Sequence, residues 1–154
     1  MKGNSEVVQH LNKQLANEQS AVNQYLLHSQ QLKDWGIDKM AETERKEAME
    51  EVGHAELLIE RILYLEGTPK LEGGRPAEMA ADVKSLLQRN LALEQTGISD
   101  LREGVLACDR ANDPVSRELF VKILADEEEH ENHLIAQLGL IEKVGIENYI
   151  AAQL

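Results

Sequence analysis

The fold is decided by a stretch that occurs twice, first as Leu15-Ala16-Asn17-Glu18-Gln19-Ser20-Ala21-Val22 and again, 76 residues later, as Leu91-Ala92-Leu93-Glu94-Gln95-Thr96-Gly97-Ile98. A second pattern recurs at the same interval, because Glu51 and His54 are matched by Glu127 and His130. In each half, the first glutamate precedes the second by 33 positions. The chain therefore carries two copies of one Glu…Glu-x-x-His arrangement.

Apolar spacing and helix-breaking residues around these copies predict four long helices and a short fifth. On the first helix, residues recur at helical spacing at Val8, Leu11, Leu15, Val22, Leu26 and, less strictly, Leu32. Gly36 is expected to end that helix, Asp38 to cap the second, and Asp113 with Pro114 to begin the fourth. The predicted helices are Ser5 or Glu6 to about Lys33, Asp38 to Leu65, Asp82 to Ala111, Pro114 to Val144, and Ile146 to about Gln153.

One long connection, Thr68 to about Ala81, separates the two halves and contains glycines and prolines. A helix of about 27 residues is about 40 Å long, and fourteen extended residues reach about 46–50 Å. The connection can therefore run the whole length of a bundle. The sequence predicts an all-α domain over residues 1–154, a four-helix bundle with one long crossover.

Residues three apart on a helix share a face, so each Glu-x-x-His can direct both side chains to one point in the core. Glu18 lies about 18 residues before the turn near Gly36 and Glu51 about 15 after it, so the two should lie at similar heights. The same holds for Glu94 and Glu127 about the turn near Asn112. Four glutamates buried in an apolar core require compensating charge, which two divalent cations supply. Carboxylates with imidazoles suit Fe(II), with manganese and zinc as competitors. The pattern predicts a dinuclear site made by Glu18, Glu51, His54, Glu94, Glu127 and His130.

Composition narrows the function further. The net charge of -12 argues against sequence-independent nucleic-acid binding, which requires clustered basic residues. Cys108 is the only cysteine, which excludes an intrachain disulfide and any cysteine-rich metal site. No stretch has the length and apolarity of a membrane span, and the N-terminus lacks the pattern of a signal peptide. A cytoplasmic location is the resulting expectation.

The chain resembles bacterioferritin, a member of the ferritin-like superfamily, over essentially its whole length. The resemblance is carried by Glu6-Val7-Val8-x-x-Leu11-Asn12, Asp34-Trp35-Gly36, Glu60-Arg61-Ile62-Leu63-Tyr64-Leu65-Glu66-Gly67-x-Pro69, Val115-Ser116-Arg117 and Leu140-Ile141-x-x-x-Gly145-x-x-Asn148-Tyr149. It implies a ferritin-like fold and a shell of two dozen subunits that stores ferric mineral. It also implies a di-iron ferroxidase centre that oxidises Fe(II) with dioxygen or peroxide, in which Glu51 and Glu127 bridge the two irons. A ferredoxin-type reductant for iron release is a further implied partner.

One departure from the family concerns haem. Bacterioferritins usually hold haem between paired subunits by a methionine that follows the first bridging glutamate, and here that position is Val52. Met49 lies one turn away but is not at the family's position. A homo-oligomer of this chain is therefore expected to bind haem weakly or not at all, although a companion subunit bearing the methionine could supply it. A second departure is Lys46 and Glu50, where some members carry His and Asp as an inner-surface iron site.

Several residues near the predicted ligands are candidates for a supporting role at the site. Gln14 and Asn90 lie one turn before Glu18 and Glu94, and their amides are hypothesised to hold the outer nitrogens of the histidine ligands. Their alternative role is a polar boundary position. Tyr25 shares the inner face with Glu18, as a hydrogen-bond or electron donor to the site or as a core residue. His10, His28 and His133 are expected at the surface or the bundle edge.

Three rival functions remain at this stage. A rubrerythrin-like peroxidase normally adds a four-cysteine iron domain, which a single cysteine excludes. A DNA-protecting mini-ferritin builds its site between subunits and often carries a basic tail, unlike this acidic chain. The third rival is a purely structural shell subunit that partners a haem-bearing one, against which the complete set of six ligands argues.

Overall fold

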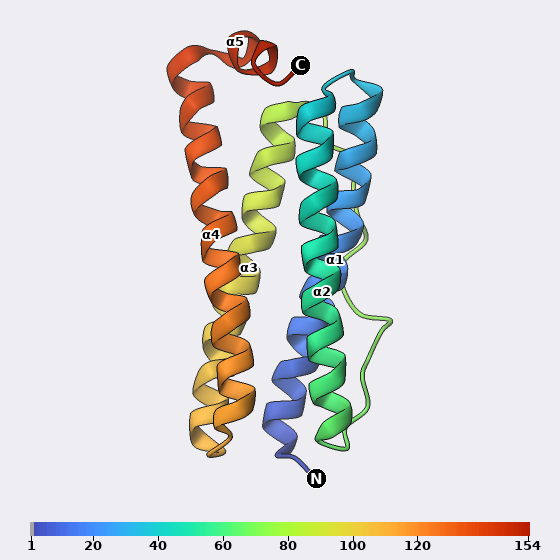
Figure 1. The fold of residues 1–154 in the computed structure, drawn as a ribbon, viewed down its shortest axis with the longest axis vertical. Coiled ribbons are helices and arrows are strands. Elements are labelled where there is room, and N and C mark those ends of the chain that lie inside the picture. The colour runs from blue at the N-terminus through green and yellow to red at the C-terminus, as the bar shows by residue number, and fades with distance from the viewer. Residues whose placement is uncertain (1) are drawn as a thin grey trace.

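A computed structural model describes residues 2–154, which form a helical bundle (Figure 1). The helices are α1 (Ser5–Asp34), α2 (Asp38–Tyr64), α3 (Val83–Arg110), α4 (Pro114–Val144) and α5 (Ile146–Ala151). Helices α1 and α2 form one antiparallel hairpin and α3 and α4 form another, while α3 runs parallel to α2. The short α5 lies across the end of the bundle where α1 meets α2. The predicted four-helix bundle with a long crossover and a short fifth helix is confirmed.

Local chemistry explains where most helices begin. The Asp113 side chain accepts a hydrogen bond from the Ser116 backbone N–H and Pro114 occupies the first turn, as predicted. The expectation that Asp38 caps α2 is wrong, since Asp38 is the first helical residue and Ile37 takes the cap position without a side-chain hydrogen bond. Ile37 is 95% buried, so packing of this side chain determines how the chain enters α2. Gly36 ends the preceding turn at a φ of 81°, which glycine adopts without steric cost.

The crossover between α2 and α3 lies along the outside of α1 (Figure 1). A row of α1 side chains holds it there by hydrogen bonds. Asn12, Gln24 and Gln31 each exchange two hydrogen bonds with its backbone, at residues 68–70, Glu78 and Ala80 respectively. Ser20 also accepts a hydrogen bond from the Arg75 N–H. These bonds satisfy an extended segment that has no strand partner.

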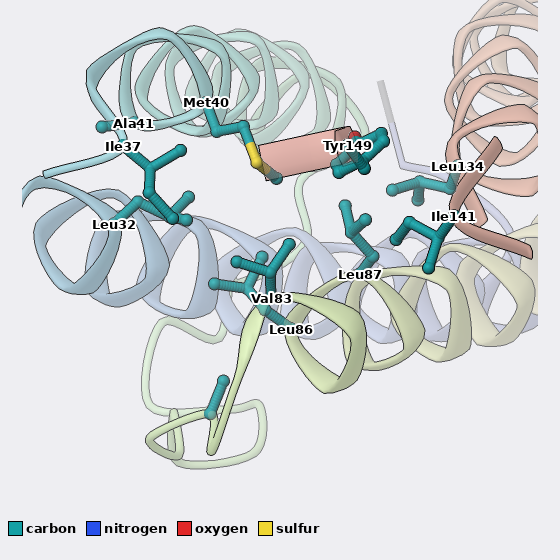
Figure 2. Close-up of a cluster of buried hydrophobic side chains, with 11 residues drawn as sticks. Leu32, Ile37, Met40, Ala41, Val83, Leu86, Leu87, Leu134, Ile141 and Tyr149 are labelled. Atoms are coloured by element: carbon teal, nitrogen blue, oxygen red, sulfur yellow. The ribbon is translucent and has the colours of Figure 1, made fainter. Parts of the chain in front are cut away.

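The core is divided into two apolar ends. One cluster lies near α5 and includes Leu86, Leu134 and Tyr149 (Figure 2), and the other lies at the opposite end and includes Leu11, Ile62 and Phe120. The layer between them contains buried polar side chains from all four long helices, among them Glu18, Glu51, Glu94 and Glu127. The bundle thus holds its charged groups in the middle of the structure, with apolar packing above and below.

The polar layer also explains why Val22 and Leu26, part of the apolar repeat on α1, do not face the core. Leu26 is 39% exposed and Val22 is half-buried on the outer side of α1, whereas Glu18 and Tyr25 take the inward positions. Leu11, Leu15 and Leu32 are buried as the spacing predicted. Within residues 2–154, no helix combines the length and apolarity needed to cross a membrane.

Candidate metal centre

The six predicted residues meet in the polar layer, one or two from each long helix. Glu18 comes from α1, Glu51 and His54 from α2, Glu94 from α3, and Glu127 and His130 from α4. The three-residue spacing places each glutamate and its histidine on the inner face of one helix. The four carboxylates and His54 are at least 94% buried.

The six side chains divide into two overlapping groups. Glu18, Glu51, His54 and Glu127 each place a ligand atom within 4.8 Å of the others, and so do Glu51, Glu94, Glu127 and His130. The Nδ1 atom of His54 lies 3.6 Å from Glu18 Oε2 and 3.1 Å from Glu127 Oε1. On the other side, the Nδ1 atom of His130 lies 3.5 Å from Glu51 Oε1 and 3.7 Å from Glu94 Oε1.

Glu51 and Glu127 belong to both groups, and each directs one oxygen to each side. Glu127 turns Oε1 toward His54 and Oε2 toward His130, at 3.1 and 3.8 Å. Glu51 turns Oε2 toward His54 and Oε1 toward His130, at 3.8 and 3.5 Å. This is the arrangement in which two carboxylates can bridge a pair of cations, while Glu18 and Glu94 each serve one cation.

The six side chains also share an unusual hydrogen-bonding state. Each has one buried ligand atom without a hydrogen-bond partner: Glu18 Oε2, Glu51 Oε1, His54 Nδ1, Glu94 Oε2, Glu127 Oε1 and His130 Nδ1. Buried polar atoms are normally paired, because leaving one unpaired costs about 1–3 kcal/mol. Six such atoms directed at one small volume fit a site built for cations.

The outer nitrogen of each histidine is held by an acid from the facing helix. His54 Nε2 lies 2.8 Å from Asp126 Oδ2, and His130 Nε2 lies 2.8 Å from both Glu50 Oε2 and Glu47 Oε2. Such contacts orient an imidazole so that Nδ1 faces the metal. This role was not predicted for Asp126 and Glu50, although their positions in the sequence indicate it. Each directly precedes a glutamate that belongs to both groups, and the two are separated by the same 76 positions as the two sets of predicted ligands.

The hypothesis that Gln14 and Asn90 hold the histidines is wrong. Gln14 instead donates a hydrogen bond to Glu18 Oε1 at 2.8 Å, and Asn90 donates to Glu44. Tyr25 is fully buried and its hydroxyl donates to Glu94 Oε1, which agrees with the predicted contact to a ligand carboxylate. One terminal carboxylate is therefore positioned by an amide and the other by a phenol.

Burial and mutual contact perturb the charges of these groups. Burial raises the pKa of Glu18, with the negative charge of Glu51 adding to the effect, and burial likewise raises the pKa of Glu94. Burial alone would lower the pKa of His54 and His130, but the carboxylates around each ring, Glu127 first, raise it far above its usual range. A cation that binds here must displace protons, so cation affinity should increase with pH.

The remaining histidines differ in their surroundings. His28 was expected at the surface or the bundle edge, but it is fully buried between Gln24 and Asn90 and bonded to both. At this level α3 packs against α1, so His28 faces Asn90 and not solvent. His10 is half-buried and His133 is exposed.

Val52, the position at which the sequence resemblance implied a haem-ligating methionine, lies on the outside of the bundle. Val52 lines a surface groove with Val22, Ile59 and Leu71. No sulfur atom lines this groove, and Met49 is 52% exposed elsewhere on α2.

Comparisons with known proteins agree with this geometry. A family model described as Ferritin-like domain matches residues 8–144. The chain is 43% identical over 155 residues to a bacterial ferritin of Synechocystis sp., covering 100% of this chain and 99% of the relative. It is 42% identical over 149 residues to a bacterioferritin of Brucella melitensis, covering 97% of this chain and 92% of the relative. A bacterial ferritin of Pseudomonas aeruginosa is 40% identical over 157 residues, covering 100% of both chains.

Proposed function

The chain belongs to the ferritin-like family, and on that premise we propose that it stores and detoxifies iron. It oxidises Fe(II) to Fe(III) at the six-residue centre and keeps the product as ferric mineral inside a shell of many copies. Residues 1–154 act as one domain in this role. The names of the full-length relatives, bacterial ferritin and bacterioferritin, support iron storage as the general function.

The observation that carries the ferroxidase part is the set of six unpaired, buried ligand atoms. Four carboxylates bring a charge of −4, which two Fe(II) ions neutralise, and the two imidazoles add nitrogen donors that suit iron. In the proposed centre, Glu18 and His54 hold one iron, Glu94 and His130 hold the other, and Glu51 and Glu127 bridge them.

The protein's contribution is positioning and charge compensation. Asp126 and Glu50 hold the histidine rings so that Nδ1 faces the iron, and Gln14 and Tyr25 orient the terminal carboxylates. The bound Fe(II) ions supply the electrons that reduce dioxygen or peroxide. The apolar clusters pack the bundle above and below the centre.

Self-assembly of many copies into a shell would enclose a space in which the oxidised iron is stored. The outer groove along α1 and α2 is lined by apolar side chains, including Val22, Val52 and the 56% exposed Leu71, that a neighbouring copy can cover. We expect a shell of two dozen subunits, with a ferredoxin-type reductant drawing iron out. The residues around Val52 do not fit haem in this chain, so a companion subunit with a methionine at this position would have to supply it.

Rapid mixing of Fe(II) with the aerobic protein tests the proposed oxidation. The wild-type protein should show a fast absorbance rise, and Glu51→Ala or His54→Ala should slow it at least about tenfold because a bridging or terminal ligand is lost. Glu128→Ala is the matched control, since this neighbour of Glu127 points to solvent and pairs with Arg102. The alternative, a structural shell subunit, predicts no fast phase in the wild type and no difference among the four proteins.

A further inference from the structure

Four buried polar side chains form a hydrogen-bonded row that the metal centre does not use. Gln24 and His28 come from α1, Asn90 from α3 and Glu44 from α2, and each is at least 95% buried. The row begins beside the crossover on the outside of α1 and ends inside the bundle. None of the four is a ligand in the proposed metal centre.

The crossover fixes the direction of every hydrogen bond in this row. Gln24 Nε2 donates to the Glu78 carbonyl oxygen at 2.8 Å, and Gln24 Oε1 accepts from the Glu78 N–H at 3.1 Å. The amide therefore cannot be turned around without losing both bonds. Its nitrogen also faces His28 Nε2 at 2.8 Å, so His28 Nε2 accepts and the ring proton resides on Nδ1.

The tautomer of His28 in turn determines which groups face Glu44. His28 Nδ1 donates to Asn90 Oδ1 at 2.9 Å, which leaves the Asn90 amide nitrogen facing Glu44. Asn90 Nδ2 donates to both carboxylate oxygens of Glu44, at 2.8 and 3.0 Å. The whole row thus delivers N–H groups to one carboxylate, which favours its charged form.

Burial works against these hydrogen bonds. Burial raises the pKa of Glu44 to about 8, while the Asn90 hydrogen bond lowers it and the charge of Glu47 raises it. Neutral His28 matches its role as a fixed donor, because burial lowers its pKa to about 4. Glu44 is consequently balanced between its two protonation states near neutral pH.

Glu44 shares a cavity with the metal centre. This cavity of about 150 Å³ is also lined by Tyr25 and His130, and it has room for several water molecules. Tyr25 bonds the ligand Glu94, and His130 is itself a ligand in the proposed centre. The other titratable or charged groups that face Glu44 across this cavity are Lys39 and Glu47 of α2, His133 of α4 and Tyr149 of α5.

We propose that Glu44 exchanges a proton with the metal centre, carrying the proton when no cation is bound and releasing it into the cavity when divalent cations bind. Gln24, His28 and Asn90 act as positioning residues for this exchange. The proposal rests on the proposed metal site. Upon release, the O–H bond of Glu44 breaks, its electron pair stays on the carboxylate oxygen, and the proton passes to a cavity water. The carboxylate left behind then adds negative charge next to the cations.

Infrared spectroscopy of the metal-free, full-length protein tests this directly, with Zn(II) as a cation that undergoes no oxidation. The difference spectrum between wild type and Glu44→Gln should contain a protonated carboxyl band at pH 7 that titrates with an apparent pKa near 8. Saturating Zn(II) at pH 7 should remove the band. Glu44→Asp gives a second assignment, since it should move the band without removing it. A wild type that lacks the band at pH 7, or retains it with Zn(II) bound, would overturn the proposal.

Two glutamines provide the matched test of the row. Gln24→Met and Gln31→Met each remove two hydrogen bonds to the crossover, but only Gln24 leads to Glu44. Gln24→Met should raise the apparent pKa of Glu44 by about one unit, since His28 and Asn90 are then free to reverse. Gln31→Met should leave it unchanged. Equal shifts, or none, would refute the positioning role. Zn(II) is not oxidised, and the infrared band reports only on the Glu44 proton. The outcome of this test therefore does not depend on whether the protein has ferroxidase activity.

Discussion

The two kinds of glutamate at the centre differ in how many cations they can reach. Glu18 belongs to one ligand group, whereas Glu51 belongs to both. We therefore expect Glu18→Ala to remove one of two binding events in an anaerobic calorimetric titration with Zn(II), and Glu51→Ala to weaken both. Identical losses in the two variants would contradict the assignment of Glu51 as a bridge.

Glu44 makes the stability of the metal-free protein depend on pH. The folded protein keeps this proton up to pH about 8, whereas an unperturbed glutamate releases it near 4.5. Between these values the folded state binds more protons, so the unfolding free energy falls as pH rises. His28 acts in the opposite sense, but only below its ordinary pKa of 6.5.

We therefore expect wild type to lose roughly 1.5 kcal/mol of unfolding free energy relative to Glu44→Gln between pH 6.5 and 8. Denaturant unfolding at the two pH values measures this difference, and the comparison with Glu44→Gln cancels the titration of other groups. A constant difference across this range would show that Glu44 titrates as an ordinary carboxylate.

The clustering of the six central residues could be predicted from sequence, because the Glu-x-x-His spacing acts within one helix and the 76-residue repeat marks equivalent positions in the two hairpins. The partners of His54 and His130 lie across the gap between α2 and α4, so their contacts depend on how these helices are rotated relative to each other. His28 was placed wrongly for the same reason. A lone polar residue carries no period, and its burial follows only from the packing of α1 against α3.

At the scale of the helices, α3 and α4 approach closely at Gly104. A Cβ atom at this position would lie 2.7 Å from Phe120 Cε1, whereas one at Gly139 of α4 would meet nothing within 4 Å. Gly104→Ala should destabilise the protein by about 1–2 kcal/mol, because overpacking outweighs the gain in helix propensity. Gly139→Ala should stabilise it by up to about 1 kcal/mol. Thermal unfolding of both variants measures the two changes in stability. Stabilisation by Gly104→Ala would contradict the close approach of α3 and α4 at this position.

Helix positions were predictable because local residues set most of them, as at Asp113 and Pro114. The start of α2 could not be predicted in this way, because it depends on the burial of Ile37 in a cluster to which several helices contribute. The path of the crossover was predictable only in length. What holds it, a row of amides on α1 that includes Asn12 and Gln31, depends on contacts between residues about 50 positions apart.

At the scale of the assembled molecule, haem content depends on one position. If paired copies meet along the groove that contains Val52, Val52→Met should allow two sulfur atoms to face each other. We expect the reconstituted variant to show the absorbance of haem held by two methionines, and the wild type to show little or none. Stoichiometric haem in the wild type would refute the account of this groove.

We propose that this chain binds two iron ions at one place, through Glu18, Glu51, His54, Glu94, Glu127 and His130. Anomalous diffraction at the iron edge, from crystals loaded anaerobically with Fe(II), locates bound iron without reference to activity. We expect two peaks in each subunit, about 3.5–4 Å apart, with Glu51 and Glu127 between them. A single peak, or peaks only at the more exposed group of Glu47, Glu50 and His130, would contradict it.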